Sequence, residues 1–176
     1  MTLHNVKPIR FNSWIGKKKF LVKNKNNNPL FQSKNNLVFT YNINDFKNKL
    51  KNGLTSEMNK NNASFFIISS RQYIFIYLYL VKFNFKIINF EMITDIMNNE
   101  IEDCEVPLDL NYRNKNLLFD FFKSKNNQIN SMTLRNENKE QFIFRSNGVI
   151  SYKNMTLDKF KKYFVKIDEA YEESQK

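Results

Sequence analysis

The most apolar stretch of the chain, residues 63–85, is divided by charged residues into pieces that are too short to span a membrane. Arg71 and Lys82 interrupt the stretch, and the uncharged run between them, Gln72–Val81, has ten residues. A membrane-spanning helix needs about 20 predominantly apolar residues. We therefore expect these residues to form buried elements of a folded core, and we expect no membrane insertion.

Capping and turn residues divide the region around this stretch into alternating helices and strands. Asn44 is suited to cap a helix, and Gly53 is suited to end it in the left-handed conformation. Ser69 and Ser70 fit the cap position of a second helix, which Asn84 would end. Apolar runs on either side of that helix are typical of buried strands. The predicted order is helix, strand, helix and strand over residues 44–52, 64–68, 71–83 and 85–93.

The remainder of the chain has mostly strand character. Short apolar runs alternate with polar residues, and Ser146-Asn147-Gly148 is a turn signal. Thr156 fits the cap of a short basic helix over residues 157–162. We therefore predict an α+β fold with an N-terminal α-β-α-β half and a C-terminal β-rich half. The predicted strands of the second half are residues 117–122, 129–134, 141–144, 149–152 and 163–167.

Charge changes sign along the chain and divides it further. Residues 1–60 carry a net charge of +10 and residues 111–166 carry +8, whereas the middle and the last ten residues are acidic. The first 44 residues contain no acid, and their Asn and Lys clusters favour loop over regular structure. We interpret this arm as an extension bound to RNA or protein, with a targeting segment or plain disorder as alternatives. The predicted segments are a basic Asn/Lys-rich extension (1–42), an α/β half (43–93), an acidic connection (94–114), a β-rich half (115–167) and an acidic tail (168–176).

The composition excludes much of the enzyme repertoire. One cysteine, Cys104, cannot form an internal disulfide, and one histidine, His4, cannot supply a multi-histidine metal site. Three glycines leave no glycine-rich phosphate loop. Carboxylates crowd residues 100–109, but a nuclease would also need a second ligand segment or a partnering base. We therefore predict no enzyme activity, no metal and no cofactor.

The net charge of +11 at pH 7 points to a polyanionic partner, either nucleic acid or an anionic membrane surface. The codon bias behind the sequence points to its origin. The chain has 29 Asn and 23 Lys but only two Ala and five Arg, as expected from an extremely A/T-rich genome. Organellar genomes are a common kind, and A/T-rich nuclear, viral and bacterial genomes are the alternatives.

Three segments match, in order, the motifs of one protein family. Ile43–Gly53 aligns without a gap with a helix of the form I-S-D-x-L-T-R-I-R-N-G. Phe65–Ile87 corresponds to strand, P-x-S-K, apolar helix, E-G-F-I and strand, although the proline is absent and Asn84 replaces the glycine. Phe144–Tyr152 corresponds to S-T-S-K-G-V-M-T-D, with Ser146, Gly148 and Val149 kept. Over about residues 43–167 the chain thus resembles small-subunit ribosomal protein eight, a universal family that binds the central domain of small-subunit rRNA.

The resemblance implies a structural constituent of a small ribosomal subunit, which the composition would place in the mitochondrial matrix, on the mitoribosome. RNA duplexes are recognised by shape, through phosphate and 2′-hydroxyl contacts across the minor groove. Small hydroxyl and amide groups on a turn, with nearby Lys and Arg, suit that task. The implied partners are the rRNA and neighbouring small-subunit ribosomal proteins, and no homo-oligomer is expected. The residues implied in RNA binding are Lys49, Lys51, Asn52, Ser69, Ser70, Arg71, Arg145, Ser146, Asn147, Gly148 and Lys153.

Each implied contact also has a plainer structural interpretation. Lys49 and Lys51 could be a solvated helix face, Ser69 and Ser70 a helix cap, and residues 146–148 an ordinary hairpin turn. Two other functions stay open at this point: a structural subunit of an organellar membrane complex, and a viral or plasmid nucleic-acid-binding protein.

Overall fold

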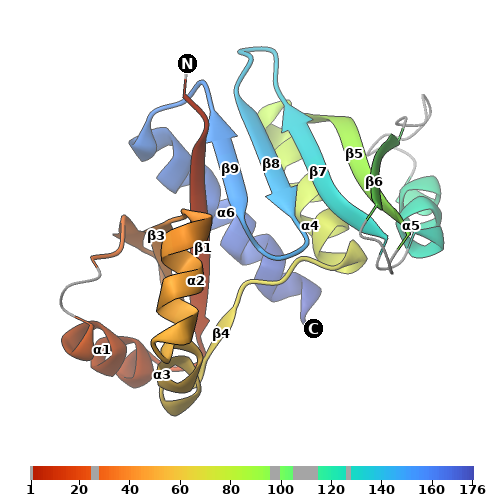
Figure 1. Cartoon of the computed structure of the whole chain (residues 1–176). Helices are drawn as coiled ribbons and strands as arrows, with labels where there is room; N and C mark the ends of the chain where they lie inside the picture. The colour runs from red at the N-terminus through yellow and green to blue at the C-terminus, as the bar shows by residue number, and fades with distance from the viewer. Residues whose placement is uncertain (1, 25–27, 96–99, 105–114, 126–127) are drawn as a thin grey trace. The chain divides into compact units, whose positions relative to one another are not determined.

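A computed structural model of the chain describes residues 2–24, 28–95, 100–104, 115–125 and 128–176 (Figure 1). These residues form six α-helices, one short 3₁₀ helix and nine strands, so the predicted α+β class is confirmed. By their internal contacts they divide into two units. The N-terminal unit comprises residues 4–67 with 148–150, and the C-terminal unit comprises residues 68–147 and 151–176 with the first three residues.

The N-terminal unit is an antiparallel sheet with three helices. Strand β1 pairs with β3 on one side and with β4 on the other, and β2 pairs with β3. The strands are β1 (His4–Phe11), β2 (Phe31–Gln32), β3 (Asn36–Thr40) and β4 (Ala63–Phe65). The helices are α1 (Trp14–Lys23), α2 (Ile43–Lys51) and α3 (Leu54–Lys60).

A small apolar core holds this unit together. Ile9 and Phe11 of β1 pack with Phe20 of α1, and the rings of Phe11 and Phe20 meet edge to face at 5.3 Å. Ser13 caps α1, because its Oγ accepts a hydrogen bond from the backbone N–H of Gly16 at 3.0 Å. The prediction that the first 44 residues favour loop is therefore wrong for β1, α1, β2 and β3. Burial of a few apolar residues orders a segment that its Asn and Lys content would leave irregular.

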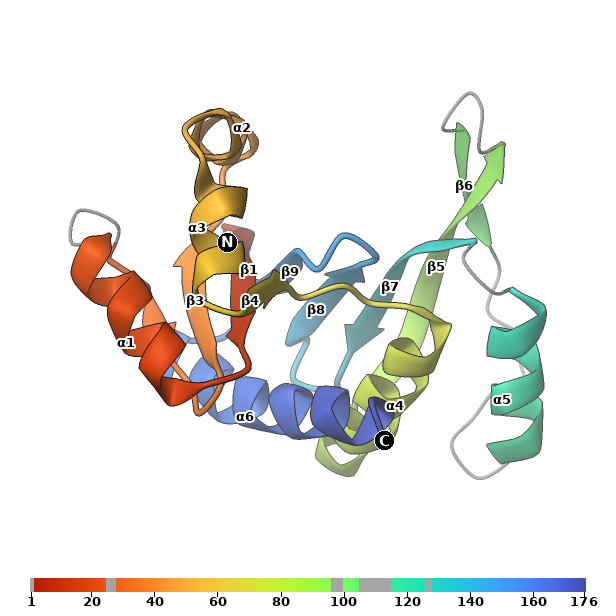
Figure 2. The same ribbon diagram turned by 90° about the horizontal axis from the view of Figure 1, so that it is seen from below.

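The C-terminal unit contains a second antiparallel array, in the order β9-β8-β7-β5-β6. Helices α4 and α6 lie against one face of these strands (Figure 2). The strands are β5 (Lys86–Asp95), β6 (Glu100–Cys104), β7 (Ile129–Arg135), β8 (Gln141–Arg145) and β9 (Ile150–Lys153). The helices are α4 (Ser70–Leu80), a 3₁₀ turn (Val81–Phe83), α5 (Lys115–Ser124) and α6 (Leu157–Ser174).

Aromatic side chains fill the core of the C-terminal unit. Phe90 of β5 packs against Phe122 of α5 with ring centroids 5.5 Å apart, and Phe142 of β8 packs against Phe85 at 5.2 Å. All four of these side chains are fully buried. Aromatic pairs of this kind stabilise the interior of the unit.

Several predicted elements are confirmed. Helix α2 is present, but its cap is Asn42, so the predicted cap Asn44 is wrong and lies inside the helix. Gly53 has the expected positive φ of 89°. Helix α4 is capped by Ser69, and Asn84 ends the following 3₁₀ turn with φ 60°. The predicted strands at 85–93, 129–134, 141–144 and 149–152 correspond to β5, β7, β8 and β9.

Two predicted strands are helices instead. Residues 117–122 lie in α5, where Leu118 and Phe122 are buried one helical turn apart. Residues 163–167 lie within the single helix α6, whose buried residues Phe160, Phe164, Ile167 and Tyr171 recur every three or four positions. Over such short windows, β-branched and aromatic residues fit either structure, and the helical spacing emerges only over the longer segment.

The boundaries of the units also differ from the predicted segments. The predicted extension and the helix at 43–51 belong to one unit, together with the turn residues 148–150. Part of the acidic connection is strand β6, which pairs with β5. The acidic residues Glu105 and Asp109 lie outside the described residues.

Candidate nucleic-acid interface

Two segments of the C-terminal unit that lie far apart in the sequence meet at one place. The backbone N–H of Ile68, just before α4, donates a hydrogen bond to the carbonyl oxygen of Ser146, just after β8, at 3.0 Å. The N–H of Ser146 donates in turn to the carbonyl oxygen of Asn130 at 2.8 Å. The structure therefore brings together two groups of predicted RNA-binding residues, Ser69–Arg71 and Arg145–Asn147.

Tyr73 fixes the start of α4 to the same region. Its hydroxyl lies 3.2 Å from the carbonyl oxygen of Asn130 and 3.3 Å from that of Phe144. Burial raises the pKa of Tyr73 far above its usual value, so the hydroxyl stays a hydrogen-bond donor at physiological pH. The positions of the helix start and the turn are thus linked through a fully buried side chain.

The three residues at the start of α4 differ in their exposure and in their contacts. Ser69 forms a reciprocal cap with Gln72, because the Ser69 N–H donates to Gln72 Oε1 at 2.9 Å and the two side chains also contact each other. The helix-cap interpretation of Ser69 is therefore confirmed. Ser70 is 8% exposed, so little of its side chain is accessible, and its RNA contact stays a prediction. Arg71 is exposed, with its guanidinium 5.8 Å from the Phe75 ring.

The turn after β8 presents a smaller polar surface than the sequence predicts. Asn147 is exposed and Ser146 is half-buried. The guanidinium of Arg145 donates to Ser151 Oγ at 2.5 Å, which holds this side chain along the neighbouring strand β9. The polar groups of this region best placed to contact a ligand are thus those of Asn147, Ser146 and Arg71.

Gly148 has a packing role rather than a surface role. It is buried, its φ is 79°, and a Cβ added to it would lie 1.3 Å from the carbonyl oxygen of Phe66. Only glycine allows the two backbones to approach this closely. That its backbone also approaches an RNA sugar edge stays a prediction.

Lys49, Lys51 and Asn52 belong to the N-terminal unit, at the end of α2. Lys51 and Asn52 are exposed, as the interpretation of a solvated helix face expects. Lys49 is half-buried, with its Nζ 5.9 Å from the centroid of the Phe39 ring. The structure thus distributes the eleven predicted residues over both units.

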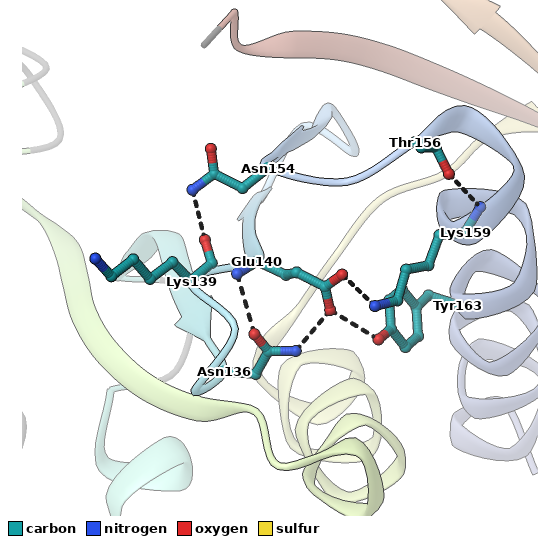
Figure 3. A network of polar contacts seen from close by, with 7 residues as sticks. All are labelled: Asn136, Lys139, Glu140, Asn154, Thr156, Lys159 and Tyr163. Carbon is teal, nitrogen blue, oxygen red and sulfur yellow. Dashed lines mark hydrogen bonds and ion pairs between the residues drawn. The ribbon is translucent and has the colours of Figure 1, made fainter.

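Lys153 ends β9, whereas the 146–148 turn precedes the start of that strand. The structure therefore does not bring Lys153 together with Ser146 and Asn147. A different polar cluster follows the end of β9, where the Asn154 side-chain amide donates to the carbonyl oxygen of Lys139 at 2.7 Å (Figure 3).

That cluster is centred on the buried carboxylate of Glu140. It accepts hydrogen bonds from Asn136 at 2.7 Å and from the Tyr163 hydroxyl at 3.0 Å, and it pairs with Lys159 (Figure 3). Burial alone would raise the pKa of Glu140, but the hydrogen bonds from Lys159, Asn136 and Tyr163 outweigh it and lower the pKa below its usual value. The cluster joins the β7–β8 connection to α6 with its polar atoms satisfied, as a structural network requires.

The sequence analysis missed two buried lysines in the basic arm. Lys17 of α1 is 8% exposed, and its Nζ donates to the carbonyl oxygens of Ser33 at 2.8 Å and Lys34 at 3.0 Å. Lys7 of β1 is 6% exposed. A lysine between apolar residues, as in Val6-Lys7-Pro8, is a weak signal of such burial. The many other lysines of this arm made the signal hard to distinguish in the sequence.

Comparisons with family models, with curated proteins and with solved structures find no match to this chain. Within the ranges that the structure describes, no helix is long and apolar enough to cross a membrane. Those ranges also contain no group of three His, Cys, Asp or Glu side chains that could hold a metal ion.

Proposed function

We propose that the chain is a structural RNA-binding protein of a small ribosomal subunit, where it holds a folded element of the central domain of the rRNA. The observation that supports this most is the hydrogen bond between Ile68 and Ser146. It joins two segments that the family resemblance independently implicates in RNA binding.

The exposed groups of this region suit a folded RNA duplex. Arg71 offers a guanidinium for a phosphate oxygen, and the Asn147 amide and Ser146 hydroxyl can both donate to and accept from a 2′-hydroxyl. The backbone beneath them is held by the bonds of Ser146 to Asn130 and Ile68. A surface fixed before binding loses less conformational entropy when the RNA docks.

One departure from the family pattern limits what the resemblance contributes. Where the pattern closes with a strand, this chain has helix α6 over Leu157–Ser174. The proposal therefore depends on the two N-terminal motifs and on the position of the 146–148 turn. In this proposal the protein catalyses no reaction and contacts neighbouring ribosomal proteins. We infer a mitochondrial ribosome from the A/T-biased composition of the chain.

Native sedimentation is the first test. The tagged protein, expressed in its own cells, should co-sediment with small ribosomal subunits in low-salt gradients and be released as salt increases. The salt effect follows from counterion release, with a log–log slope of about −0.7 to −0.9 per phosphate contact. Sedimentation with membranes, or free of subunits at low salt, would contradict the proposal and support one of the alternative functions.

Site-directed variants test the interface itself. Arg71→Gln and Asn147→Ala should each weaken binding to a small-subunit rRNA fragment about threefold to tenfold, with a smaller effect on an unrelated duplex. Arg135→Gln is a matched control, because Arg135 is exposed and pairs with Gln141, at the end of β8 away from the turn. Equal effects of Arg71→Gln and Arg135→Gln on both RNAs, with no effect of Asn147→Ala, would show general charge attraction and no site at the turn.

A further inference from the structure

Helix α1 of the N-terminal unit presents a surface on which exposed apolar and basic side chains are mixed. Trp14 is 67% exposed, Ile15 60% and Val22 59%, which places them among the most exposed large apolar residues that the structure describes. Neighbouring exposed apolar side chains mark interaction sites, whereas single ones need no explanation. We call this region the α1 surface, an open pocket lined by Trp14, Ile15, Lys18, Lys19, Val22 and Lys23.

The spacing of these residues gives the α1 surface the form of a helix-packing face. Residues four apart lie on one row of a helix, so two parallel rows run along the surface. The first row consists of Trp14, Lys18 and Val22, and the second of Ile15, Lys19 and Lys23. Each row combines apolar and basic side chains. The groove between two such rows is the place where a second helix lays its own row of side chains.

The opposite side of α1 fixes the helix in the N-terminal unit. Phe20 is buried in the core, and the Lys17 amine donates hydrogen bonds to two backbone carbonyl oxygens. Gly16 packs so closely that an added Cβ would lie 2.2 Å from the carbonyl oxygen of Asn61. The α1 surface is therefore formed before a partner arrives, which reduces the conformational entropy lost on binding.

The charge of the α1 surface is complementary to carboxylates. The first 44 residues contain no acid, so every charged side chain of α1 is basic. At the end of the second row, the Lys23 Nζ pairs with a carboxylate oxygen of Glu57 in α3 at 2.7 Å. The chain itself thus places a glutamate of one helix against this row. Lys18 and Lys19 are exposed and offer the same chemistry to carboxylates of a partner.

We propose that the α1 surface binds an acidic amphipathic helix of a partner protein. The apolar row of that helix packs between Trp14, Ile15 and Val22, and its flanking carboxylates pair with Lys18 and Lys19. Tryptophan is the kind of anchor around which the energy of protein interfaces is concentrated. This binding does not depend on the proposed RNA contact, because α1 belongs to the N-terminal unit and the turn after β8 to the C-terminal unit.

Two other classes of ligand fit the α1 surface less well. A nucleobase stacks on an open aromatic face, but the Lys18 Nζ lies over the Trp14 ring, 5.1 Å from its centroid, and the aliphatic neighbours provide no ring. A helix that lies on a lipid surface has its apolar residues on one face and its lysines on the other, whereas α1 carries both on the same face. A protein helix presents apolar and charged groups side by side, as the α1 surface requires.

The test uses the fluorescence of Trp14, which is the single tryptophan of the chain. The full chain is titrated with a synthetic helix that has leucines along one face and glutamates beside them. The emission should shift to shorter wavelength and saturate, because the indole leaves water. A second peptide, of equal charge but with serines in place of the leucines, should cause no shift. No saturable shift with the leucine peptide, or the same shift with both peptides, would overturn the proposal.

Two double variants separate this site from general charge attraction. Lys18→Gln combined with Lys19→Gln should weaken binding of the leucine peptide about tenfold or more. Lys34→Gln combined with Lys47→Gln removes the same charge from exposed positions of the same unit and should weaken binding less than about threefold. Circular dichroism and thermal unfolding check that both proteins fold. Equal weakening by the two double variants would overturn the proposal.

A pair of apolar variants tests the packing contact. Ile15→Ser should weaken peptide binding about fivefold or more, because its side chain lies in the groove between the rows. Ile43→Ser is the matched control, since Ile43 is 53% exposed but belongs to α2, and it should change binding less than about twofold. The same loss for both variants would contradict a site on α1.

The other ligands are outcomes of the same fluorescence measurement. Oligouridylate, a single-stranded RNA, would quench Trp14 at lower concentrations than the peptide acts if the surface bound RNA, and vesicles of phosphatidylcholine and phosphatidylglycerol would shift the emission if it bound lipid. Either result would overturn the proposal. Arg71→Gln should leave peptide binding unchanged within about twofold. Failure of the α1 site and failure of the RNA interface are therefore distinguishable.

Discussion

The backbone N–H of Ile68 donates to the carbonyl oxygen of Ser146 at 3.0 Å, and this bond joins the entry to α4 with the turn that follows β8. Because Ser146 also donates to Asn130, the turn is fixed on both sides. The exposed groups of Arg71 and Asn147 therefore project from a defined backbone and not from a free loop. The proposed recognition of RNA shape would require such an arrangement.

Gly148→Ala should destabilise the protein by about 3 kcal/mol or more, since the new Cβ would collide with Phe66 and the residue would keep a positive φ. The free energy of unfolding in urea measures this. Gly53→Ala is the matched control, because Gly53 also has a positive φ but has no atom within 4 Å of the added Cβ. Its cost should be only about 1 kcal/mol. Similar losses for both variants would contradict the proposed backbone contact.

Tyr73→Phe should lower the free energy of unfolding by about 1 kcal/mol, because the hydroxyl near the Asn130 and Phe144 carbonyl oxygens is lost without a change in ring volume. RNA binding should also weaken, since the Tyr73 hydroxyl helps to hold the turn in place. Tyr41→Phe in the N-terminal unit is a control, because Tyr41 is half-buried and Tyr73 is fully buried. A Tyr73→Phe protein with unchanged stability would show that these contacts do not position the turn.

Lys17→Met should reduce the stability of the N-terminal unit by about 1–3 kcal/mol, because the carbonyl oxygens of Ser33 and Lys34 lose their common donor. Lys19→Met removes the same charge from an exposed position of the same helix and should change stability by less than about 0.5 kcal/mol. Thermal unfolding of the two variants compares them directly. Equal losses for the two variants would show that Lys17 contributes no more to stability than an exposed lysine does.

Glu140→Gln should reduce the acid sensitivity of the fold. The pKa of Glu140 is lower in the folded chain than the value of about 4.3 for an unfolded glutamate, so the carboxylate network stabilises the protein above that pH. This contribution is lost as the pH falls through the folded pKa. At pH 7 the variant should be less stable by about 1–3 kcal/mol, and the difference should narrow towards pH 3.

Urea midpoints at pH 7, 5, 4 and 3 would measure the effect. Glu137→Gln changes an exposed carboxylate in the same β7–β8 connection and should follow the wild-type profile. A Glu140→Gln profile parallel to that of the wild type would exclude the network as a source of acid sensitivity.

The sequence by itself determined the features that depend on a few neighbouring residues. Gly53 and Asn84 adopt the positive φ angles expected where a helix must end. Ser69 caps α4, and its backbone N–H donates a hydrogen bond to the side chain of Gln72. The strands β5, β7, β8 and β9 were predictable because apolar runs of strand length are bounded there by turn residues. These signals act over one or two turns of chain, so local chemistry is enough to decide them.

The tertiary structure alone decided the features that depend on distant partners. Residues 117–122 and 163–167 have strand-forming side chains, but burial against the C-terminal core selects the helical spacing of Phe122, Phe164 and Ile167. The basic arm is ordered because Ile9 and Phe11 pack with Phe20 and Leu37 in the core of the N-terminal unit. Lys7 acquires its aromatic surroundings from three separate elements, and Ile68 meets Ser146 only after folding. Such contacts carry no local pattern, because the free energy that selects them comes from burial shared among residues far apart in the chain.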